Sequence, residues 1–110
     1  MKDLTLYESI FLVAILRLGK KAYGINIRRE IRNQTKKTLS YGTLYSYLDQ
    51  LFRKGLVERS VGEPTKERGG RRKVYYRMTP RGKEALKAAH ELHKSIWEAL
   101  PEHAWEETSA

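Results

Sequence analysis

The chain has 110 residues, of which 40% are hydrophobic and 10% aromatic, and this is enough for one folded domain. It contains no cysteine, which excludes disulfide frameworks and thiolate zinc sites. Its longest apolar run, residues 10–16, is too short to cross a bilayer, and no signal-peptide pattern is visible. We therefore expect a cytoplasmic protein with no membrane partner.

The formal net charge is +9, and it is unevenly distributed. Residues 1–83 carry 20 Lys and Arg against 7 Asp and Glu, whereas residues 84–110 carry 2 against 6. A strongly basic domain is typical of proteins that bind a polyanion such as nucleic acid. Charge alone also fits a soluble surface with excess lysine, so the pattern of the segments must decide between the two.

Residues 4–18 are dense in apolar side chains and contain no glycine or proline, which predicts a helix. Thr5 and Glu8 have the spacing of a capping box at its start. Because this segment is apolar nearly all round, one core face does not account for it. We expect part of it to be buried against another element or another chain.

Residues 23–34 place Tyr23, Ile27 and Ile31 four positions apart, which predicts an amphipathic helix with an arginine-rich outer face. Gly24, near its start, allows either close packing or the approach of the backbone to a phosphate. A short linker follows over residues 35–39, and it contains Lys36 and Lys37.

Residues 40–54 predict a third helix, with Ser40 as N-cap and Gly55 as the residue that ends it. Its large apolar residues form one stripe for burial, namely Leu44, Leu48, Leu51 and Phe52. Its opposite face is small and polar at the start and basic at the end, and it carries Gly42, Thr43, Ser46, Gln50 and Arg53.

Two alternating runs, residues 56–62 and 71–78, predict the strands of a hairpin with a polar, basic turn between them. Thr79 and Pro80 then have the pattern of a helix start, and we expect a last helix over residues 80–100 with a frayed tail. This helix has a heptad-like apolar seam formed by Leu86, Ala89, His93, Ile96 and Leu100, and Trp97 flanks it.

The second and third helices form a helix-turn-helix, the hairpin adds a basic wing, and this arrangement suits duplex DNA. Short residues at the start of the third helix let its backbone approach base edges, and Thr43, Ser46 and Gln50 can hydrogen-bond bases. Basic residues on either side can contact phosphates. The predicted DNA-binding residues are Tyr23, Arg28, Lys36, Lys37, Ser40, Tyr41, Gly42, Thr43, Ser46, Gln50, Arg53, Lys66, Arg68, Arg71, Arg72 and Lys73.

Each of these features also has a purely structural interpretation. A face of Ser, Thr and Gln can simply be solvated, and Tyr45 and Tyr47 can be packing residues beside the apolar stripe. The basic run 71–73 can serve as an edge that prevents strand aggregation. The features favour DNA binding in combination, in this order and with this charge.

The chain resembles the PadR family of winged-helix transcriptional regulators. The resemblance covers nearly the whole chain, from about Leu6 to the last helix. The motifs that carry it are Tyr23-Gly24, the run Ser-Tyr-Gly-Thr-Leu-Tyr at 40–45, Leu51, Gly55-Leu56-Val57, the run at 69–79 and Gly82. At the position after Gly-Thr-Leu-Tyr the family commonly has proline, whereas this chain has Ser46, which leaves a hydroxyl on the DNA side.

The resemblance implies a mainly α fold with a β-hairpin wing. A winged helix-turn-helix domain would span residues 1–79, and a C-terminal dimerisation helix with a frayed tail would span residues 80–110. It also implies a nucleoid-associated homodimeric repressor on a palindromic operator, with recognition helices about 34 Å apart. In the family the last helix packs against the last and first helices of the partner, so the implied interface residues are Leu6, Ile10, Leu86, Ala89, His93, Ile96, Trp97 and Leu100.

The short tail resembles the compact branch of the family, in which some members look like drug sensors that bind flat aromatic compounds. By this resemblance His93 and Trp97 are candidates for contact with a small-molecule effector, although Trp97 can equally be an interface anchor. His90 and His93 have the spacing of a metal-binding pair but lack a clear third ligand, so we expect neither metal nor cofactor.

No nucleophile–base arrangement, phosphate-binding loop or pair of acids is visible, so we do not expect an enzyme. The alternative function class is a winged-helix module for protein interaction or for sequence-neutral DNA packaging.

Overall fold

The computed structural model describes residues 3–64 and 72–106. Its elements are α1 (Leu6–Leu18), a 3-10 turn (Gly19–Lys21), α2 (Gly24–Thr35), α3 (Tyr41–Arg53), β1 (Val57–Pro64), β2 (Arg72–Met78) and α4 (Pro80–Glu98). The two strands form an antiparallel hairpin in which Val57 pairs with Met78 and Val61 with Val74. The predicted mainly α fold with a β-hairpin is therefore confirmed.

The helix starts are determined by local hydrogen bonds that the sequence predicted. The Thr5 hydroxyl accepts from the Glu8 amide and the Glu8 carboxylate accepts from the Thr5 amide, so the capping box of α1 is present. The Ser40 hydroxyl accepts from the Thr43 amide, and α4 starts with a capping threonine followed by Pro80. Gly55 has φ of +73°, as expected of the residue that ends α3.

Some predicted boundaries differ from the structure by one or two residues. Helix α1 begins at Leu6 rather than at position 4, and α4 ends at Glu98 rather than at position 100. The first strand spans residues 57–64 where 56–62 was expected, and the second begins one residue later than expected but ends at Met78 as predicted. Such differences arise because the terminal turns of an element have few hydrogen bonds to define them.

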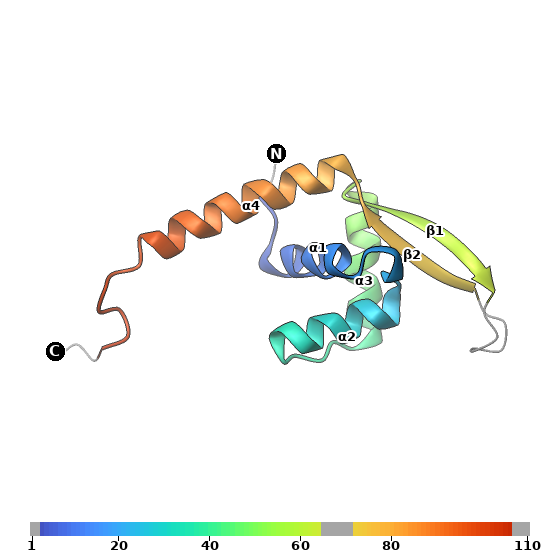
Figure 1. The fold of residues 1–110 in the computed structure, drawn as a ribbon, viewed down its shortest axis with the longest axis horizontal. Coiled ribbons are helices and arrows are strands. Elements are labelled where there is room, and N and C mark those ends of the chain that lie inside the picture. The colour runs from blue at the N-terminus through green and yellow to red at the C-terminus, as the bar shows by residue number, and fades with distance from the viewer. Residues whose placement is uncertain (1–2, 65–71, 107–110) are drawn as a thin grey trace.

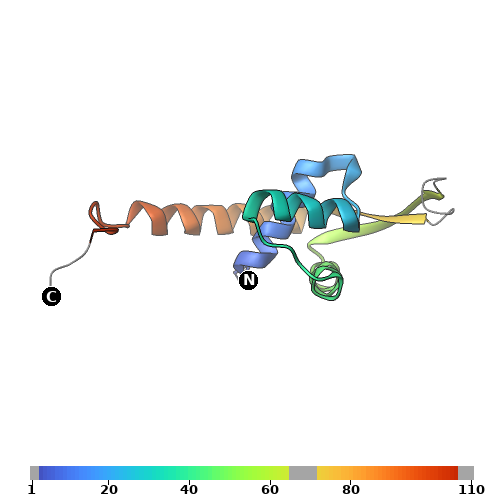
Figure 2. The same cartoon turned by 90° about the horizontal axis from the view of Figure 1, so that it is seen from below.

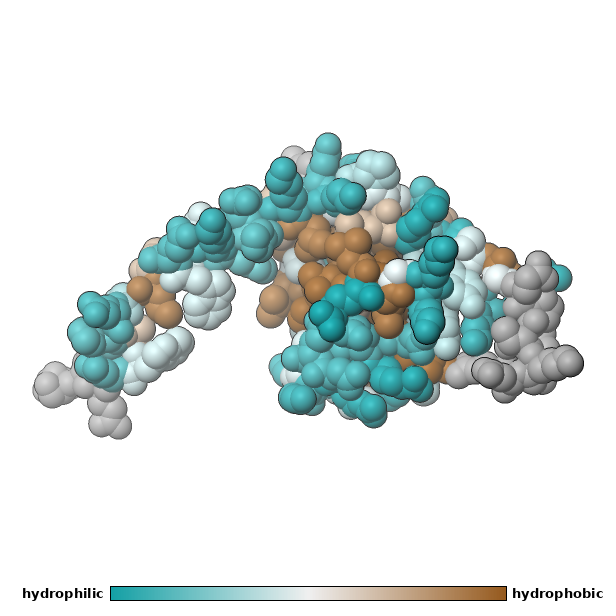
Figure 3. All heavy atoms as spheres, in the orientation of Figure 1, coloured by the Kyte–Doolittle hydropathy of each residue, from teal (hydrophilic) through white to brown (hydrophobic). Residues whose placement is uncertain are grey.

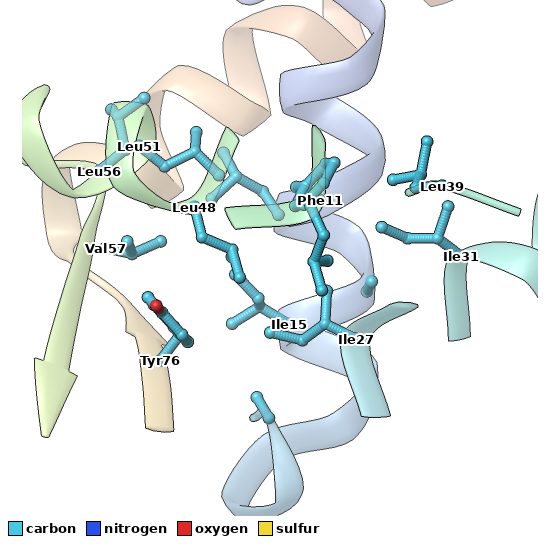
Figure 4. Close-up of a cluster of buried hydrophobic side chains, with 14 of the residues drawn as sticks. Phe11, Ile15, Ile27, Ile31, Leu39, Leu48, Leu51, Leu56, Val57 and Tyr76 are labelled. Carbon is cyan, nitrogen blue, oxygen red and sulfur yellow. The ribbon is translucent and has the colours of Figure 1, made fainter. Parts of the chain in front are cut away.

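The core lies between α1, α2 and α3, and the base of the hairpin closes it. In Figure 4 the labelled side chains from these elements point toward one another, with Phe11 and Ile15 of α1 near Leu48 of α3. Tyr47 packs on Phe11 with ring centroids 5.1 Å apart. The apolar residues that are completely buried are Phe11, Leu12, Ala14, Ala22, Ile27, Ile31, Leu44, Leu48 and Leu51.

One member of the predicted apolar stripe of α3 is not part of this core. Phe52 is 38% exposed, and the guanidinium of Arg59 on β1 lies 3.7 Å from its ring centroid. Phe52 therefore joins α3 to the wing instead of filling the interior. The prediction that it is buried with the three leucines is wrong, because the hairpin and not a helix covers this side of α3.

Helix α4 leaves the body as an arm (Figure 1). Only its first half is packed, through Ala85 and Ala89, both of which are 5% exposed. A compact chain of this length has a radius of gyration of about 13 Å. The observed value is 17.0 Å, and the principal extents are 62 × 29 × 21 Å. The second half of α4 therefore extends away from the body, and most of its residues are exposed within the part of the chain that the structure describes.

Candidate nucleic-acid interface

Helix α3 projects from one side of the molecule. Figure 2 shows it end-on, standing clear of α2 and α4. Gly42 and Ser46 are exposed on its outer face, and a Cβ added to Gly42 would meet no atom within 4 Å. The start of this helix therefore presents bare backbone and short side chains, a shape that fits into a DNA groove.

The hydroxyls of Ser40 and Thr43 lie at the same end of α3. The Ser40 Oγ accepts from the Thr43 amide at 3.1 Å and donates to the Thr43 Oγ1 at 3.0 Å. Both residues are exposed. Their oxygens keep free acceptor capacity toward solvent, next to a helix N-terminus that favours phosphate.

Gln50 is placed differently from the other predicted contact residues. Its side-chain amide donates to Glu8 Oε2 at 3.1 Å, and Lys54 Nζ lies 2.6 Å from the same oxygen. The Glu8 side chain is 1% exposed. Gln50 is therefore turned toward α1, while Arg53 remains 78% exposed. A contact of Gln50 with bases stays a prediction that would require it to leave Glu8.

The charge of Glu8 is stabilised inside the protein. Burial alone raises the pKa of the Glu8 carboxyl, but hydrogen bonds from Lys54, the Thr5 amide and Gln50 outweigh burial and hold this pKa below its ordinary value of 4.5. Through its contacts with Gln50 and Lys54, Glu8 thus links the start of α1 to the end of α3.

Arg28 and Tyr41 form a pair at the join between α2 and α3. Arg28 Nε donates to the carbonyl of Leu39 at 2.7 Å, and the guanidinium lies 4.4 Å from the centroid of the Tyr41 ring. Tyr41 is 53% exposed. The nearby Lys36 closes α2 with φ of 64°, and Lys37 is exposed beside it. The join between α2 and α3 therefore carries three cationic side chains, Arg28, Lys36 and Lys37, and the phenol of Tyr41. Such groups can donate hydrogen bonds to phosphate oxygens.

The wing forms the other edge of α3. Lys73 Nζ lies 4.3 Å from the Tyr23 ring centroid, and Tyr23 meets Tyr75 edge to face. Arg72 is exposed on the same strand. A hollow of about 530 Å³ lies between the wing, the start of α2 and Tyr45 of α3, and Tyr23, Arg72 and Lys73 help to line it. The other predicted wing contacts, Lys66, Arg68 and Arg71, lie outside the described residues.

Gly24 is explained by packing. A Cβ at this position would collide with the phenol of Tyr45 on α3. The absence of a side chain therefore lets α2 and α3 approach closely, which supports the packing interpretation over that of a phosphate contact.

Two charged residues of this surface, Asp49 and Arg59, were not among the predicted site residues. Asp49 Oδ2 lies 2.9 Å from Arg53 Nε, and Asp49 Oδ1 lies 3.9 Å from Arg59 Nη1. The spacing of Asp49 and Arg53 on one helix could have indicated the first pair. The second pair joins α3 to β1, and no local pattern predicts it.

The residues assigned to a dimer interface fall into two groups. Leu6, Ile96 and Trp97 are more than half exposed, at 63%, 55% and 63%, and Leu100 is 37% exposed. Ile10, Leu86 and His93 are half-buried, while Ala89 is buried in its own chain. Figure 3 shows apolar side chains gathered over α1 and others along the arm of α4. Further exposed apolar side chains on these helices are Val13, Leu16 and Leu92.

A sequence profile of the transcriptional regulator PadR-like family matches residues 12–88. This chain belongs to that family. A PadR family transcription regulator from Clostridium difficile has 28% sequence identity and a TM-score of 0.71, over 86% of this chain and 94% of that chain. RosR of H. salinarum has 31% identity and a TM-score of 0.68, over 89% and 81% of the two chains. A comparison with curated proteins found no match.

A PadR-like regulator of Bacillus cereus, at 19% identity, has the same fold with a TM-score of 0.74 over 93% of this chain and 94% of that chain. These likenesses confirm the family and the winged helix-turn-helix fold. Membership in the PadR-like family implies DNA-binding regulation of transcription. Proteins of this family and fold are transcriptional regulators, which are generally not enzymes.

Among residues 3–64 and 72–106, no helix combines the length and the hydropathy needed to cross a membrane. Over the same ranges, no group of three or more His, Asp and Glu side chains is placed to hold a metal ion.

Proposed function

We propose that this PadR-like protein is a dimeric, sequence-specific repressor that binds a palindromic operator in double-stranded DNA. The observation that carries the proposal is the presence of two separate surfaces. Helix α3 projects on the side away from the viewer of Figure 1 and carries exposed short and polar residues at its start, and exposed apolar side chains lie on α1 and α4. One surface fits DNA, and the other fits a second copy of the chain.

Support for DNA binding comes from the chemistry around α3. Gly42, Thr43 and Ser46 are exposed at its start, so base edges can be reached by backbone and hydroxyl groups. Cations flank this helix on both sides, with Arg28 and Lys37 before it and Lys73 on the wing. Cations at such places hold the helix in register on the phosphate backbone.

Support for a dimer comes from the arm of α4. Leu92, Ile96 and Trp97 are 45%, 55% and 63% exposed on a helix that has left the body of its own chain. Apolar surface of this kind on an extended element is typical of a helix that pairs with a partner. In this proposal residues 1–79 bind DNA, and residues 80–110 pair the two copies at the spacing of successive major grooves, about 34 Å.

The test of DNA recognition is fluorescence anisotropy with two labelled duplexes. One carries an inverted repeat taken from the DNA that flanks its own gene, and the other carries the same bases in scrambled order. Sequence-specific binding predicts a preference for the repeat that survives raised salt. A weak preference with a steep salt slope would indicate sequence-neutral packaging, and binding to neither duplex would leave protein interaction as the function.

We also propose that a planar aromatic effector releases the repressor by binding between the two α4 helices. Trp97 is 63% exposed on the arm, and the half-buried His93 lies one helical turn before it. An exposed indole offers a flat face for stacking, and planar cations bind such faces well. The test is a titration with planar cationic dyes while tryptophan emission is recorded. The Trp97→Phe variant separates its signal from that of Trp105, and unquenched emission below millimolar dye would contradict the proposal.

The proposed location follows from the proposed partner. A regulator that binds chromosomal DNA acts in the cytoplasm and is associated with the nucleoid. Fluorescence imaging of a tagged copy should show overlap with stained DNA, and a signal spread evenly through the cell would contradict this location.

A further inference from the structure

The outer face of α3 carries a carboxylate near its centre. Gly42, Ser46, Asp49 and Arg53 follow one another at steps of four, three and four residues, so they lie in one stripe along the helix. The Asp49 side chain is 43% exposed in this stripe. An acidic group at this place lies on the surface that faces DNA in the proposed function, where its charge repels phosphates.

Asp49 lies between two arginines that come from different elements. One carboxylate oxygen is 2.9 Å from Arg53 Nε on α3, and the other is 3.9 Å from Arg59 Nη1 on β1. Arg59 is also held by the ring of Phe52, whose centroid is 3.7 Å from its guanidinium. The side chains of Arg53 and Arg59 are 78% and 40% exposed, so both would be accessible to DNA if Asp49 did not hold them.

Arginines that are free to contact phosphates would strengthen binding to every DNA sequence alike. Each phosphate contact adds affinity through the release of counterions, and it does so without reference to the bases. The hydroxyls of Thr43 and Ser46, by contrast, can discriminate between bases. A carboxylate that neutralises the two arginines therefore removes affinity that does not depend on sequence, so that a larger share of the remaining affinity comes from base contacts.

We propose that Asp49 suppresses the sequence-independent part of DNA binding by holding Arg53 and Arg59 away from phosphates. This inference rests on the proposed DNA-binding function. It adds that a repulsive group on the recognition helix limits phosphate contacts there.

The wing contains a matched pair for comparison. Glu58 Oε2 lies 2.8 Å from Arg77 Nη2, and the two side chains are 54% and 81% exposed. Glu58 and Arg77 are cross-strand partners on the hairpin. They line a hollow with Leu16 and Lys20, at the end of α1, rather than with α3. Glu58→Gln therefore removes one negative charge, as Asp49→Asn does. It breaks one exposed ion pair where Asp49→Asn breaks two, and it lies away from the outer stripe.

The experiment measures binding of the full chain to a labelled duplex pool of random sequence between about 50 and 200 mM salt. The Asp49→Asn variant is expected to bind this pool roughly tenfold more tightly than the wild type near 100 mM salt, with a salt slope steeper by about 1 to 2. Glu58→Gln is expected to change the affinity by less than about threefold and the slope by less than about 0.5. The salt slope of Asp49→Asn exceeds that of the wild type by the increment expected above. In the double variant Asp49→Asn, Arg53→Gln, at least half of this increment is expected to be lost.

Equal changes in Asp49→Asn and Glu58→Gln would overturn the proposal, because net charge alone would then explain them. Weaker binding of Asp49→Asn to the random pool would also overturn it, since Asp49 would then place the arginines for contact. In both cases the wild type still binds DNA, so the proposed function stands. If the wild type binds no duplex at all, the proposed function fails and this inference fails with it.

Discussion

Gly42 and Gly24 lie in the first turns of adjacent helices, and their surroundings differ completely. A Cβ at Gly24 would collide with Tyr45, whereas a Cβ at Gly42 would meet no atom within 4 Å. A side chain at position 24 would therefore force Tyr45 to shift, whereas position 42 has room for one. Because glycine in a helix costs stability, a reason for Gly42 has to be sought outside the protomer.

The Gly42→Ala variant is expected to be more stable than the wild type and to bind operator DNA less well. Alanine favours the helix by about 0.5–1 kcal/mol, so the melting temperature should rise. The added methyl group would separate the backbone from the base edges, and we expect at least a roughly tenfold loss of affinity, about 1.4 kcal/mol. Calorimetry measures the melting temperature, and fluorescence anisotropy measures the affinity for operator DNA. Unchanged affinity in a stabilised variant would show that Gly42 does not approach DNA.

The buried carboxylate of Glu8 makes stability depend on pH in a defined direction. Hydrogen bonds to its charged form hold the pKa of Glu8 in the folded protein below its ordinary value of 4.5. A group whose pKa is lower in the folded than in the unfolded protein contributes stability above the unfolded pKa, and this contribution is lost as the pH falls through the folded pKa.

Glu8→Gln is therefore expected to lower the free energy of unfolding by about 1–3 kcal/mol at pH 7, with a difference that shrinks as the pH falls below about 4. Urea denaturation across this pH range measures it. The exposed Glu58→Gln variant serves as control, with an expected loss of at most about 1 kcal/mol. A Glu8→Gln deficit that stays constant down to pH 3 would mean that the charge of Glu8 does not stabilise the fold.

At the scale of elements, the start of α4 is fastened to the end of α3. The Thr79 amide donates to the Leu56 carbonyl at 3.0 Å, and the Thr79 hydroxyl donates to the Gly55 carbonyl at 2.6 Å. A Cβ at Gly82 would collide with the Leu56 carbonyl and would lie 2.8 Å from Met78 Cγ. The direction in which the arm leaves the body is therefore set by contacts of its first turn with the segment that follows α3.

Gly82→Ala is expected to lower the free energy of unfolding by about 1–3 kcal/mol. The added methyl group would overlap the Leu56 carbonyl, and relieving this overlap requires a shift of α4. The matched control is Gly42→Ala, since both glycines lie in first helical turns and only one of them is crowded. Thermal denaturation of the two variants should give melting temperatures that move in opposite directions. Equal shifts of the two melting temperatures would show that the first turn of α4 does not pack against residue 56 as described.

The sequence predicted these elements well because their starts depend on neighbours in the chain. Thr5, Ser40 and Thr79 each bond an amide three residues ahead, and such pairs are visible in the sequence. The pairs that were not predicted join distant positions. Gln50 and Lys54 meet Glu8 across more than forty residues, and Arg59 stacks on Phe52 of another element. No local periodicity encodes such contacts, since the packing of helices and hairpin creates them.

At the scale of the whole molecule, the body and the α4 arm differ in how their apolar residues are buried. The body has a closed core between three helices and the hairpin, whereas the arm carries exposed apolar residues beyond Ala89. The seam predicted for this helix is therefore divided. Ala89 packs within its own chain, whereas Ile96 and Leu100 of the seam and the flanking Trp97 remain exposed. In the proposed function these exposed residues meet the partner.

Ile96→Asp is expected to give a folded monomer, because a charge placed in an apolar interface is costly to bury. Sedimentation measures the loss of the dimer, and circular dichroism should show unchanged folding. Loss of the second half-site contact should weaken operator binding by at least about a hundredfold. Ser95→Asp adds the same charge one residue earlier on the exposed helix and should remain dimeric. A dimeric Ile96→Asp variant would place the interface elsewhere.

Selection of bound duplexes from a randomised pool, followed by sequencing, tests whether two copies of α3 recognise a palindrome. We expect enrichment of an inverted repeat whose half-site centres lie about 10 base pairs apart, one helical turn or about 34 Å. Ser46→Ala and Thr43→Ala should relax the selected bases within each half-site, because each substitution removes a hydroxyl that can hydrogen-bond base edges. A selected pool with no shared sequence, or with a single unrepeated site, would mean that two copies of α3 do not recognise a palindrome.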